Sequence, residues 1–542
     1  MSNTKDYSEE IYQIQNLLDI GEIFQALNAA KQLLSQEPND KSLQSCCAGI
    51  FIDCGSALQD VELVNHGITL IEALLAKDDA QSSHRVILNY NLSNGYAELA
   101  SLRRKTGANE AASEAFQKQK QLLQTVLLEK ENLPSELLPN AITNYANLLD
   151  HLGRTVEAVD HYYDCLEVTP NHATAMGNCG SALQRLLNIS TANNSKVLYE
   201  AWRLMREANQ HEADLVRLSG RHVLPYYKSS LENFEKYIES VVPGGCIALE
   251  KWITGFEKAH QWRPSPMLNT LKNDRLILTV NPRPSNCPSE YKDDIFFEGM
   301  VVAIDDSGQR LFNALAHAFN HAKEDFATAR YLYYQSKSQE PSLIEVSTIT
   351  LYMDTLDYAD FGLRSGFLKS SLRLAADLLD KCAGFLNLYL ELGHPEDQVI
   401  LNNVWYNKLQ YKKGLHPKVE SRLSSNQYLA ALNDLNKDLY LGKYPTSFRN
   451  LRNEATHKRL VLSWYGALDE SDSSYSLEEF QRTVRFLLRM AKAAIVYVVG
   501  VVMIEEQQRE LERQNSEGKN CIAPGLPSRI GFGLSDEVDR QE

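Results

Sequence analysis

NAITNYANLLDHLGRTVEAVDHYYDCLEVTP, residues 140–170, decides the fold class of the N-terminal part of the chain. Apolar residues recur every three or four positions on either side of Gly153, which predicts two amphipathic helices joined by a tight turn. The small residues Ala146 and Ala158 let two antiparallel helices approach closely, while Tyr162 fills the groove beside them. Pro170 ends the second helix. The stretch therefore predicts a helical hairpin.

The hairpin pattern recurs, which predicts a repeat architecture. The residues that carry the other copies are Gly21, Ala26, Ala30, Leu33, Pro38, Cys47, Ala48 and Phe51; Tyr96, Leu99, Ala100, Gly107, Ala112 and Phe116; and Met176, Cys179, Gly180 and Leu183. Residues 5–190 resemble the tetratricopeptide family, whose arrays bind peptides or protein surfaces in a concave groove. The alternative is a packing scaffold with no external ligand. The 46-residue interval from Gly107 to Gly153 exceeds the usual period of about 34, so we expect long helices or an insertion there.

The bulk composition is that of a globular, multidomain protein. A chain of 542 residues is too long for one core and should divide into two to four domains. The N-terminus has no basic segment followed by an apolar one, so we expect a cytoplasmic protein. The most apolar run, Ala493 to Ile504, is about half the length of a membrane span, so we expect a buried helix and no membrane partner. Nine scattered cysteines without CxxC spacing imply neither a disulfide framework nor a metal site, and no cofactor is expected.

The charge is uneven along the chain. The net charge of −15 argues against a general nucleic-acid coating function, because phosphate contacts require clustered Lys and Arg. Between Asn402 and Val461, however, eleven Lys and Arg face four Asp and Glu, a local charge of 11 − 4 = +7. This segment is either a solvated basic surface or a surface that contacts phosphates.

The chain is predicted to be mainly α, with a solenoid, a mixed α/β connector and a C-terminal bundle. We divide it into helical repeats (1–190), the connector (191–341), the bundle (342–514) and a disordered tail (515–542). Within the connector, Arg275–Val280 (RLILTV) reads as a strand and Met300–Ile304 as its partner.

Four helices are expected in the bundle. The i, i+3, i+4 recurrence of apolar residues predicts one from Ser370 to Leu392, and Gly393 ends it. Others are expected at 426–440 and from Thr446 to about Tyr465. The last begins after Ser476, which with Glu479 forms a capping box.

The candidate chemistry lies in RNEATH, from Arg452 to His457, inside the basic segment. An Arg followed by a polar residue, with four to six residues between the Arg and a His on a late bundle helix, resembles the HEPN family (higher eukaryote and prokaryote nucleotide-binding domains), over about 342–513. Many members of that family are metal-independent ribonucleases that dimerise to build a composite site; others are inactive nucleotide-binding or scaffold domains. Four other pairs share the spacing without that context: Arg154/His161, Arg206/His211, Arg217/His222 and Arg310/His317.

The resemblance implies a specific division of roles. RNA carries its own nucleophile, the 2′-hydroxyl, so cleavage needs an acid or base near neutrality, for which His457 is suited, and a cation beside the phosphate, supplied by Arg452. Asn453 would orient the His or hold the phosphate. Residues five apart on an ideal helix point about 140° away from each other, so a homodimer that joins two copies is expected. The alternative is that Arg452 and His457 pair with carboxylates of neighbouring helices.

Two functions follow. The first is a conditional endoribonuclease acting in stress or phage defence, regulated by its repeats, in which Arg449, Lys458 and Arg459 guide the RNA backbone or are simply solvated. The second is a non-catalytic scaffold with peptide-binding repeats and a dimerising or nucleotide-binding bundle. RNA turnover by the purified protein discriminates between them.

Overall fold

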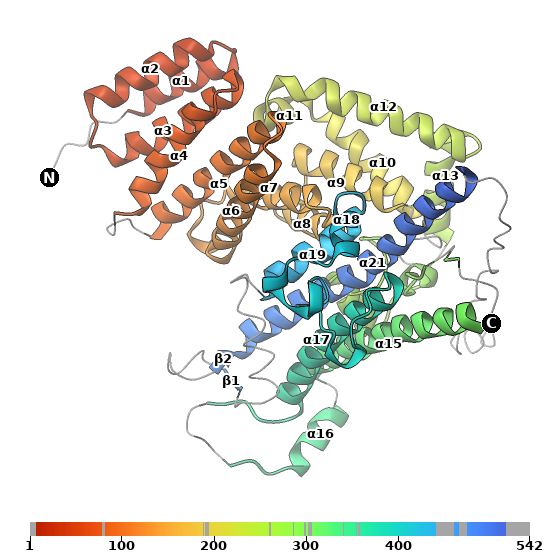
Figure 1. The fold of residues 1–542 in the computed structure, drawn as a ribbon. Helices are drawn as coiled ribbons and strands as arrows, with labels where there is room; N and C mark the ends of the chain where they lie inside the picture. The colour runs from red at the N-terminus through yellow and green to blue at the C-terminus, as the bar shows by residue number, and fades with distance from the viewer. Residues whose placement is uncertain are drawn as a thin grey trace.

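The computed structural model describes residues 7–77, 82–187, 189, 194–259, 262–285, 287–297, 300–301, 306–339, 341–353, 355, 358–440, 460–464 and 474–515. The protein is 78% helical, which confirms the mainly α prediction. Helical hairpins form an arc from the N-terminus, and the later helices gather around one long helix, α21 (Leu477–Asn515) (Figure 1).

The N-terminal arc fits a repeat solenoid of antiparallel helices. The quoted stretch forms α7 and α8, and Gly153 makes the turn between them at φ +82°. Ala146 and Ala158 have no exposed surface, which confirms their predicted position between the two helices. The helices of the arc are α1 (Ser8–Asp19), α2 (Ile23–Gln36), α3 (Lys41–Leu58), α4 (Val61–Leu75), α5 (Ser82–Lys105), α6 (Asn109–Leu128), α7 (Leu138–His151), α8 (Thr155–Val168), α9 (Ala173–Leu186) and α10 (Asn194–Gln210).

The long repeat interval in the middle of the array has a simple origin. Helices α5 and α6 contain 24 and 20 residues, against 14 in each of α7 and α8. A 3₁₀ turn, η1 (Lys130–Asn132), then separates α6 from α7. Helix α5 ends before Gly107, so the extra residues between Gly107 and Gly153 come from α6, which is 20 − 14 = 6 residues longer than α8, and from the nine residues 129–137 that connect α6 to α7.

The connector consists mainly of helices, but residues 274–285 and 292–297 are neither helix nor strand, and the strand expected at Arg275–Val280 does not form. The segment is buried, and its backbone groups bind side chains instead of a partner strand. Asp293 accepts from the Leu278 amide at 2.8 Å, and Arg330 donates to the Leu276 carbonyl at 2.9 Å. Its proposed partner is only partly described: Met300 and Val301 form no strand, and 302–305 lie outside the described residues. The helices are α11 (Glu212–Ser219), η2 (Arg221–Val223), α12 (Leu224–Val241), α13 (Gly245–Ala259), α14 (Pro266–Asn273) and η3 (Pro288–Tyr291).

The C-terminal bundle packs three long helices together. Helix α17 lies along both α15 and α21, and α19 packs on α21. The elements are α15 (Asp306–Lys337), α16 (Pro341–Ile349), α17 (Leu363–Tyr389), η4 (Glu396–Gln398), η5 (Asn407–Leu409), η6 (Tyr411–Lys413), α18 (Pro417–Leu423), α19 (Gln427–Tyr440), β1 (Val461–Ser463), β2 (Ser474–Ser476) and α21. Helices α17, α19 and α21 confirm three of the four predicted bundle helices, and the Glu479 amide donates to Ser476 Oγ at 3.1 Å, as a cap requires.

The helix predicted from Thr446 to about Tyr465 is wrong at its described end. Residues 446–459 lie outside the described residues, but Val461–Ser463 is a strand that pairs in parallel with Ser474–Ser476. The Leu462 carbonyl accepts from the Asp360 amide at 2.6 Å. Lateral pairing on two sides therefore holds this segment extended.

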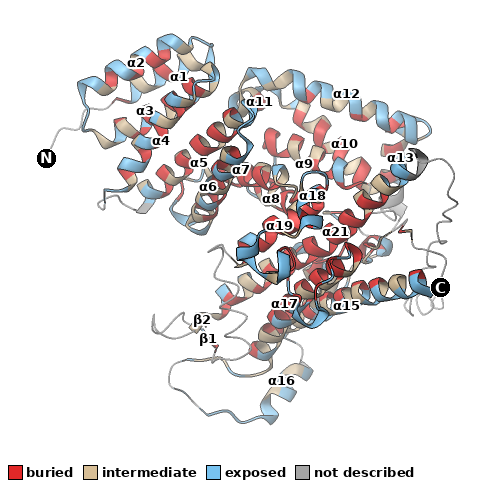
Figure 2. Ribbon diagram, viewed as in Figure 1, coloured by how far each residue is buried: buried red, intermediate tan, exposed pale blue. Residues whose placement is uncertain are grey.

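Helix α21 is the centre of the bundle. It is apolar and long enough to cross a membrane, yet 83% of its most apolar window is buried inside the fold. Figure 2 shows it buried along most of its length, in contrast to the exposed α12. The prediction that Ala493–Ile504 is a buried bundle helix is confirmed. One hydrophobic cluster joins α21 to α7, α8, α17 and α19, so the later repeats and the bundle share a core.

The crossing of α19 and α21 depends on a glycine. A Cβ atom at Gly500 would lie 2.4 Å from ring atoms of Tyr428, so we expect Gly500→Ala to lower the free energy of unfolding by about 1–3 kcal/mol through overpacking. Gly384→Ala is the matched control, because a Cβ there has nothing within 4 Å in the interior of α17 and should stabilise by roughly 0.4–1 kcal/mol. Urea unfolding measures both. Equal midpoints for the two variants would contradict the close approach.

Candidate active site

The residues predicted to carry the chemistry, Arg449, Arg452, Asn453, His457, Lys458 and Arg459, lie outside the described residues. The described chain fixes both ends of their segment, 441–459. Helix α19 ends at Tyr440 on its N-terminal side, and Leu460 and β1 follow on its C-terminal side. The candidate site is therefore defined by two anchors, one at each end.

The C-terminal anchor joins β1 to the start of α17. Besides its pairing with β2, Ser463 forms an isolated antiparallel bridge with Ala359. The next residue, Trp464, is 56% exposed, and the Arg364 guanidinium lies 5.4 Å from the centre of its ring. An exposed aromatic ring beside a cation is a combination that binds unstacked bases.

Three cations on α17 accompany this anchor: Arg364, Lys369 and Arg373. Burial lowers the pKa of Lys369, and the neighbouring Arg373 lowers it further. Asp360, which lies at the same anchor, opposes this lowering, so cations and a carboxylate share this end of the bundle. Sequence reasoning missed these residues, because they lie outside the basic segment 402–461; the spacing of Lys and Arg in LRSGFLKSSLR (363–373) was the available signal.

The N-terminal anchor is a buried ionic cluster that ties α19 to the repeats. Lys120 Nζ lies 2.8 Å from Asp434 Oδ1 and 2.8 Å from Asp438 Oδ1. Arg154 Nη1 lies 3.0 Å from Asp434 Oδ2 and also pairs with Asp438, and its Nε donates to Glu157 at 2.9 Å. We call these five residues the seam cluster. Each is at most 7% exposed, so the cluster is largely buried.

Helix α21 takes part in the same seam. The Tyr497 hydroxyl donates to Glu157 Oε2 at 3.2 Å. Nearer the start of the helix, Arg489 Nε donates to the Asp274 carbonyl at 2.9 Å and Lys492 to the Arg275 carbonyl at 3.3 Å. Arg275 in turn pairs with Asp164 of α8 at 2.6 Å. The two helices that flank the candidate segment are thus both bound to the repeat α8.

The seam cluster fixes the ionisation of its members. Burial disfavours the charge of Asp434, but Lys120 and Arg154 outweigh burial and hold its pKa well below the usual range. Burial also opposes the charge of Arg154, and Glu157 and Asp438 outweigh it, so the pKa of Arg154 is raised well above its ordinary value. Both groups therefore remain charged at neutral pH.

The depressed pKa of Asp434 predicts how the seam responds to acid. The pKa in the folded protein is below that of an unfolded Asp, about 3.9, so the stabilisation is present above that pH and is lost as the pH falls toward the folded value. We expect Asp434→Asn to lower the unfolding midpoint at pH 7 and to change it less as the pH falls below about 4. A thermal-unfolding series against pH tests this. An equal difference between wild type and variant at every pH would contradict it.

Four members of the other Arg–His pairs form ion pairs with carboxylates. Arg154 belongs to the seam cluster, and His161 Nδ1 lies 3.3 Å from Asp164 Oδ2. Arg206 pairs with Glu250 at 3.2 Å, and Arg217 with Asp214 at 3.1 Å. Pairing with a carboxylate is also the alternative role for Arg452 and His457, in place of catalysis. Among the described residues, no group of three or more His, Cys, Asp or Glu side chains is arranged to hold a metal ion.

Comparison with known protein families identifies the C-terminal bundle. Residues 309–506 match the model of the family described as LA2681-like HEPN. The match begins within α15, upstream of position 342 where sequence analysis starts the bundle, and it includes α17, α19 and most of α21. No tetratricopeptide family model matches the N-terminal region. No curated protein matches the chain. A helical region that fits a repeat solenoid is therefore followed, at residues 309–506, by a HEPN-family domain.

Proposed function

We propose that the protein is a metal-independent endoribonuclease whose helical repeats control its HEPN domain. The observation that carries the proposal is the family match over 309–506, because it spans the basic segment that contains Arg452 and His457. HEPN domains are commonly ribonucleases or nucleotide-binding domains. The exposed Trp464 and the cations of α17, at the C-terminal end of the candidate segment, supply groups suited to an RNA strand.

The proposed chemistry uses the 2′-hydroxyl of RNA as the nucleophile. His457 removes the proton of that hydroxyl or protonates the leaving 5′-oxygen, and Arg452 stabilises the charge that develops on the phosphate. Asn453 orients the His or holds the phosphate. Arg449, Lys458 and Arg459 guide the RNA backbone, and two copies of the chain complete the site.

The proposed role of the repeats is conditional control. The seam cluster joins α6 and α8 to α19, whose last residue, Tyr440, directly precedes the candidate segment. A peptide or protein bound in the repeat groove would act on the HEPN domain through this contact, provided that it binds the two arrangements of the seam with different affinities. An effector of stress response or phage defence in the cytoplasm fits this design.

RNA turnover by the purified protein tests the proposal. We expect cleavage of at least one RNA in a broad panel, in the presence of EDTA, by a species that sediments as a dimer. Cleavage that requires an added divalent metal, or a monomer of full activity, would contradict the mechanism.

The alternative is a non-catalytic scaffold with a dimerising or nucleotide-binding bundle. The structural pairing of Arg154, His161, Arg206 and Arg217 favours it, because the same spacing elsewhere in the chain serves packing. A stoichiometric protein partner in a pull-down, together with no turnover of RNA under any condition, would support this function.

A further inference from the structure

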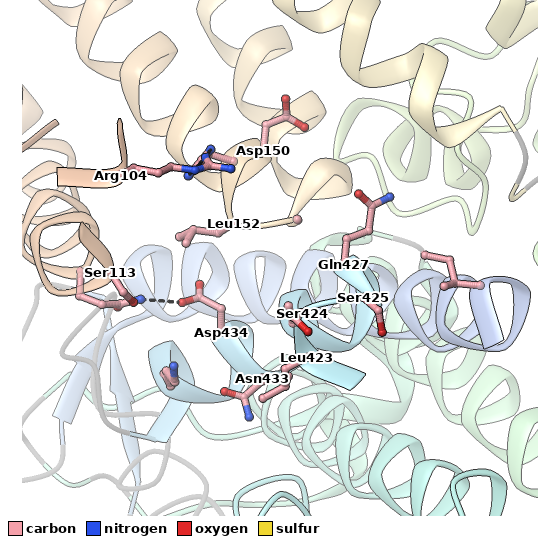
Figure 3. Close-up of a pocket in the computed structure, with 16 residues that line it drawn as sticks. Arg104, Ser113, Asp150, Leu152, Leu423, Ser424, Ser425, Gln427, Asn433 and Asp434 are labelled. Atoms are coloured by element: carbon pink, nitrogen blue, oxygen red, sulfur yellow. Dashed lines mark hydrogen bonds between the residues drawn. The ribbon is translucent and has the colours of Figure 1, made fainter. Parts of the chain in front are cut away.

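Helix α16 (Pro341–Ile349) is not covered by the rest of the chain in the way that other apolar elements are. At the seam, Leu152 of the repeats and Leu423 of the bundle line the two sides of a cavity, and both are half-buried against the shared core (Figure 3). Helix α16 instead lies away from the bundle (Figure 1) and makes no extensive contact with any other described helix or strand.

Large apolar side chains on α16 and just after it are exposed. In the described stretch from Ser342 to Met353 no residue is buried. The exposed fraction is 58% for Ile344, 76% for Ile349, 94% for Leu351 and 88% for Met353. Single apolar residues are normal on a protein surface, but a concentration of large ones marks a surface that binds something else.

Helix α16 is too short to be stable in water by itself. Isolated helices of fewer than about 12–15 residues are marginal, and α16 has nine, four of them β-branched and therefore poor helix formers. At 3.6 residues per turn, its apolar residues lie around the whole helix: Leu343, Ile344, Val346 and Ile349. A helix that is apolar all round is normally buried. We therefore expect a surface outside the described chain to enclose α16.

The charge of this part of the chain indicates which kind of surface fits it. We call residues 341–361 the arm. The arm contains four acidic residues, Glu345, Asp354, Asp357 and Asp360, and no Lys, Arg or His. Contact between the arms of two copies would bring like charges together, and an anionic lipid surface would repel the arm. A basic protein surface attracts it.

We propose that the arm is the docking site for a partner protein that has an apolar groove with Lys or Arg along its rim. Helix α16 lies in the groove as a short helix, and Ile349, Leu351 and Met353 are the apolar anchors that supply most of the affinity. The carboxylates of the arm pair with the cations of the rim, which favours basic partners over acidic ones.

The arm is connected to the strand that follows the candidate segment 441–459. The rings of Tyr352 and Phe361 are stacked with their centres 6.2 Å apart, so the exposed part of the arm contacts its C-terminal end. That end pairs with β1, since the Asp360 amide donates to the Leu462 carbonyl at 2.6 Å. A partner on the arm therefore acts on β1. The binding itself does not depend on the proposed ribonuclease, whereas an effect on RNA cleavage rests on it.

Photo-crosslinking in the cells that naturally make the chain identifies the partner. The probe is a benzophenone amino acid placed at Ile349 or at Leu351 of the full chain. The matched control is the same probe at Ile20, an apolar residue at the end of α1 that is 72% exposed. We expect one protein to crosslink from both positions of the arm and not from Ile20.

Calorimetry with the crosslinked protein, purified, and the full chain tests the assigned chemistry. We expect Ile349→Asp and Leu351→Asp each to weaken binding by about tenfold or more, because each loses the burial of a large apolar side chain. Ile20→Asp should leave the affinity unchanged. The affinity of the wild-type chain should fall as salt is raised, because salt screens the ion pairs at the rim. Circular dichroism checks that all three variants are folded.

Hydrogen exchange tests the state of the arm directly. We expect the amides of residues 342–353 to exchange fast in the free chain, because α16 packs on no other described element, and slowly in the complex. Slow exchange in the free chain would mean that α16 is already enclosed, and it would contradict the proposal.

Three further results would overturn the proposal. One is that the probes at Ile349 and Leu351 capture nothing that the probe at Ile20 does not also capture. Another is that they capture a second copy of the chain, which would make the arm a contact between copies. The third is that the captured protein binds Leu351→Asp as tightly as wild type. Partner binding to a wild-type chain that cleaves no RNA would argue against the proposed ribonuclease alone.

Discussion

His457→Ala protein is expected to cleave RNA about 10²–10⁴-fold more slowly than wild type, the loss that follows removal of a general acid or base. The assigned role of His457 is proton transfer between the 2′-hydroxyl and the 5′-oxygen, and alanine has no group that replaces it. Initial rates on a labelled RNA in EDTA measure the effect. Cleavage that no longer depends on pH near neutrality would accompany it, because the imidazole is the group that titrates there.

His317→Ala is the matched control for this experiment. His317 follows Arg310 with a spacing that also satisfies the pattern, and it is exposed on α15, inside the matched HEPN region. We expect its rate to equal that of wild type. Unchanged cleavage by His457→Ala protein, or equal losses in the two variants, would contradict the assignment of His457.

Arg154→Leu is expected to lower the free energy of unfolding by about 3–5 kcal/mol, the cost of removing one partner from a buried ionic cluster. Arg154 is 1% exposed and contacts Glu157, Asp434 and Asp438. Without it, Lys120 alone faces three buried carboxylates. We expect the unfolding midpoint in urea to fall, and the amides of α19 to exchange with deuterium faster because the seam opens.

Arg217→Ala is the control for the seam variant. Arg217 pairs with Asp214 on the surface and is 69% exposed, so its removal should change stability by less than about 0.5 kcal/mol. If Arg154→Leu and Arg217→Ala unfold at the same urea concentration, the seam cluster does not hold the repeats against the bundle.

The helical architecture was largely predictable, because small residues and apolar periodicity act locally. Ala146, Ala158 and Gly153 predict the α7–α8 hairpin within one short stretch, and Ser476 with Glu479 predicts the start of α21. The expected strand at Arg275–Val280 failed for a physical reason. Residues 275–280 are buried, so they have the apolar composition of a strand. Asp293 and Arg330 nevertheless bind their backbone groups, so no strand pairing forms, and a single sequence does not show these tertiary contacts.

The seam could not be predicted from the sequence. Arg154 and Asp434 are 280 positions apart, and a single sequence contains no signal that pairs residues at such separations. In the sequence, Arg154 stands out only as the Arg of one Arg–His spacing. Asp434 and Asp438 are only two of the four acidic residues in a basic segment. The roles of Arg452, Asn453 and His457 stay predictions, since the described residues end at Tyr440 and resume at Leu460.

The chemical nature of the RNA ends tests the central claim most directly. RNA would be incubated in EDTA with wild-type protein and with Arg154→Leu protein, and the products identified by mass spectrometry. Attack by the 2′-hydroxyl predicts fragments with a 2′,3′-cyclic phosphate on one side of each break and a 5′-hydroxyl on the other. Fragments with 5′-phosphate ends, or intact RNA with both proteins, would contradict the claim that this chain is a repeat-controlled, metal-independent ribonuclease.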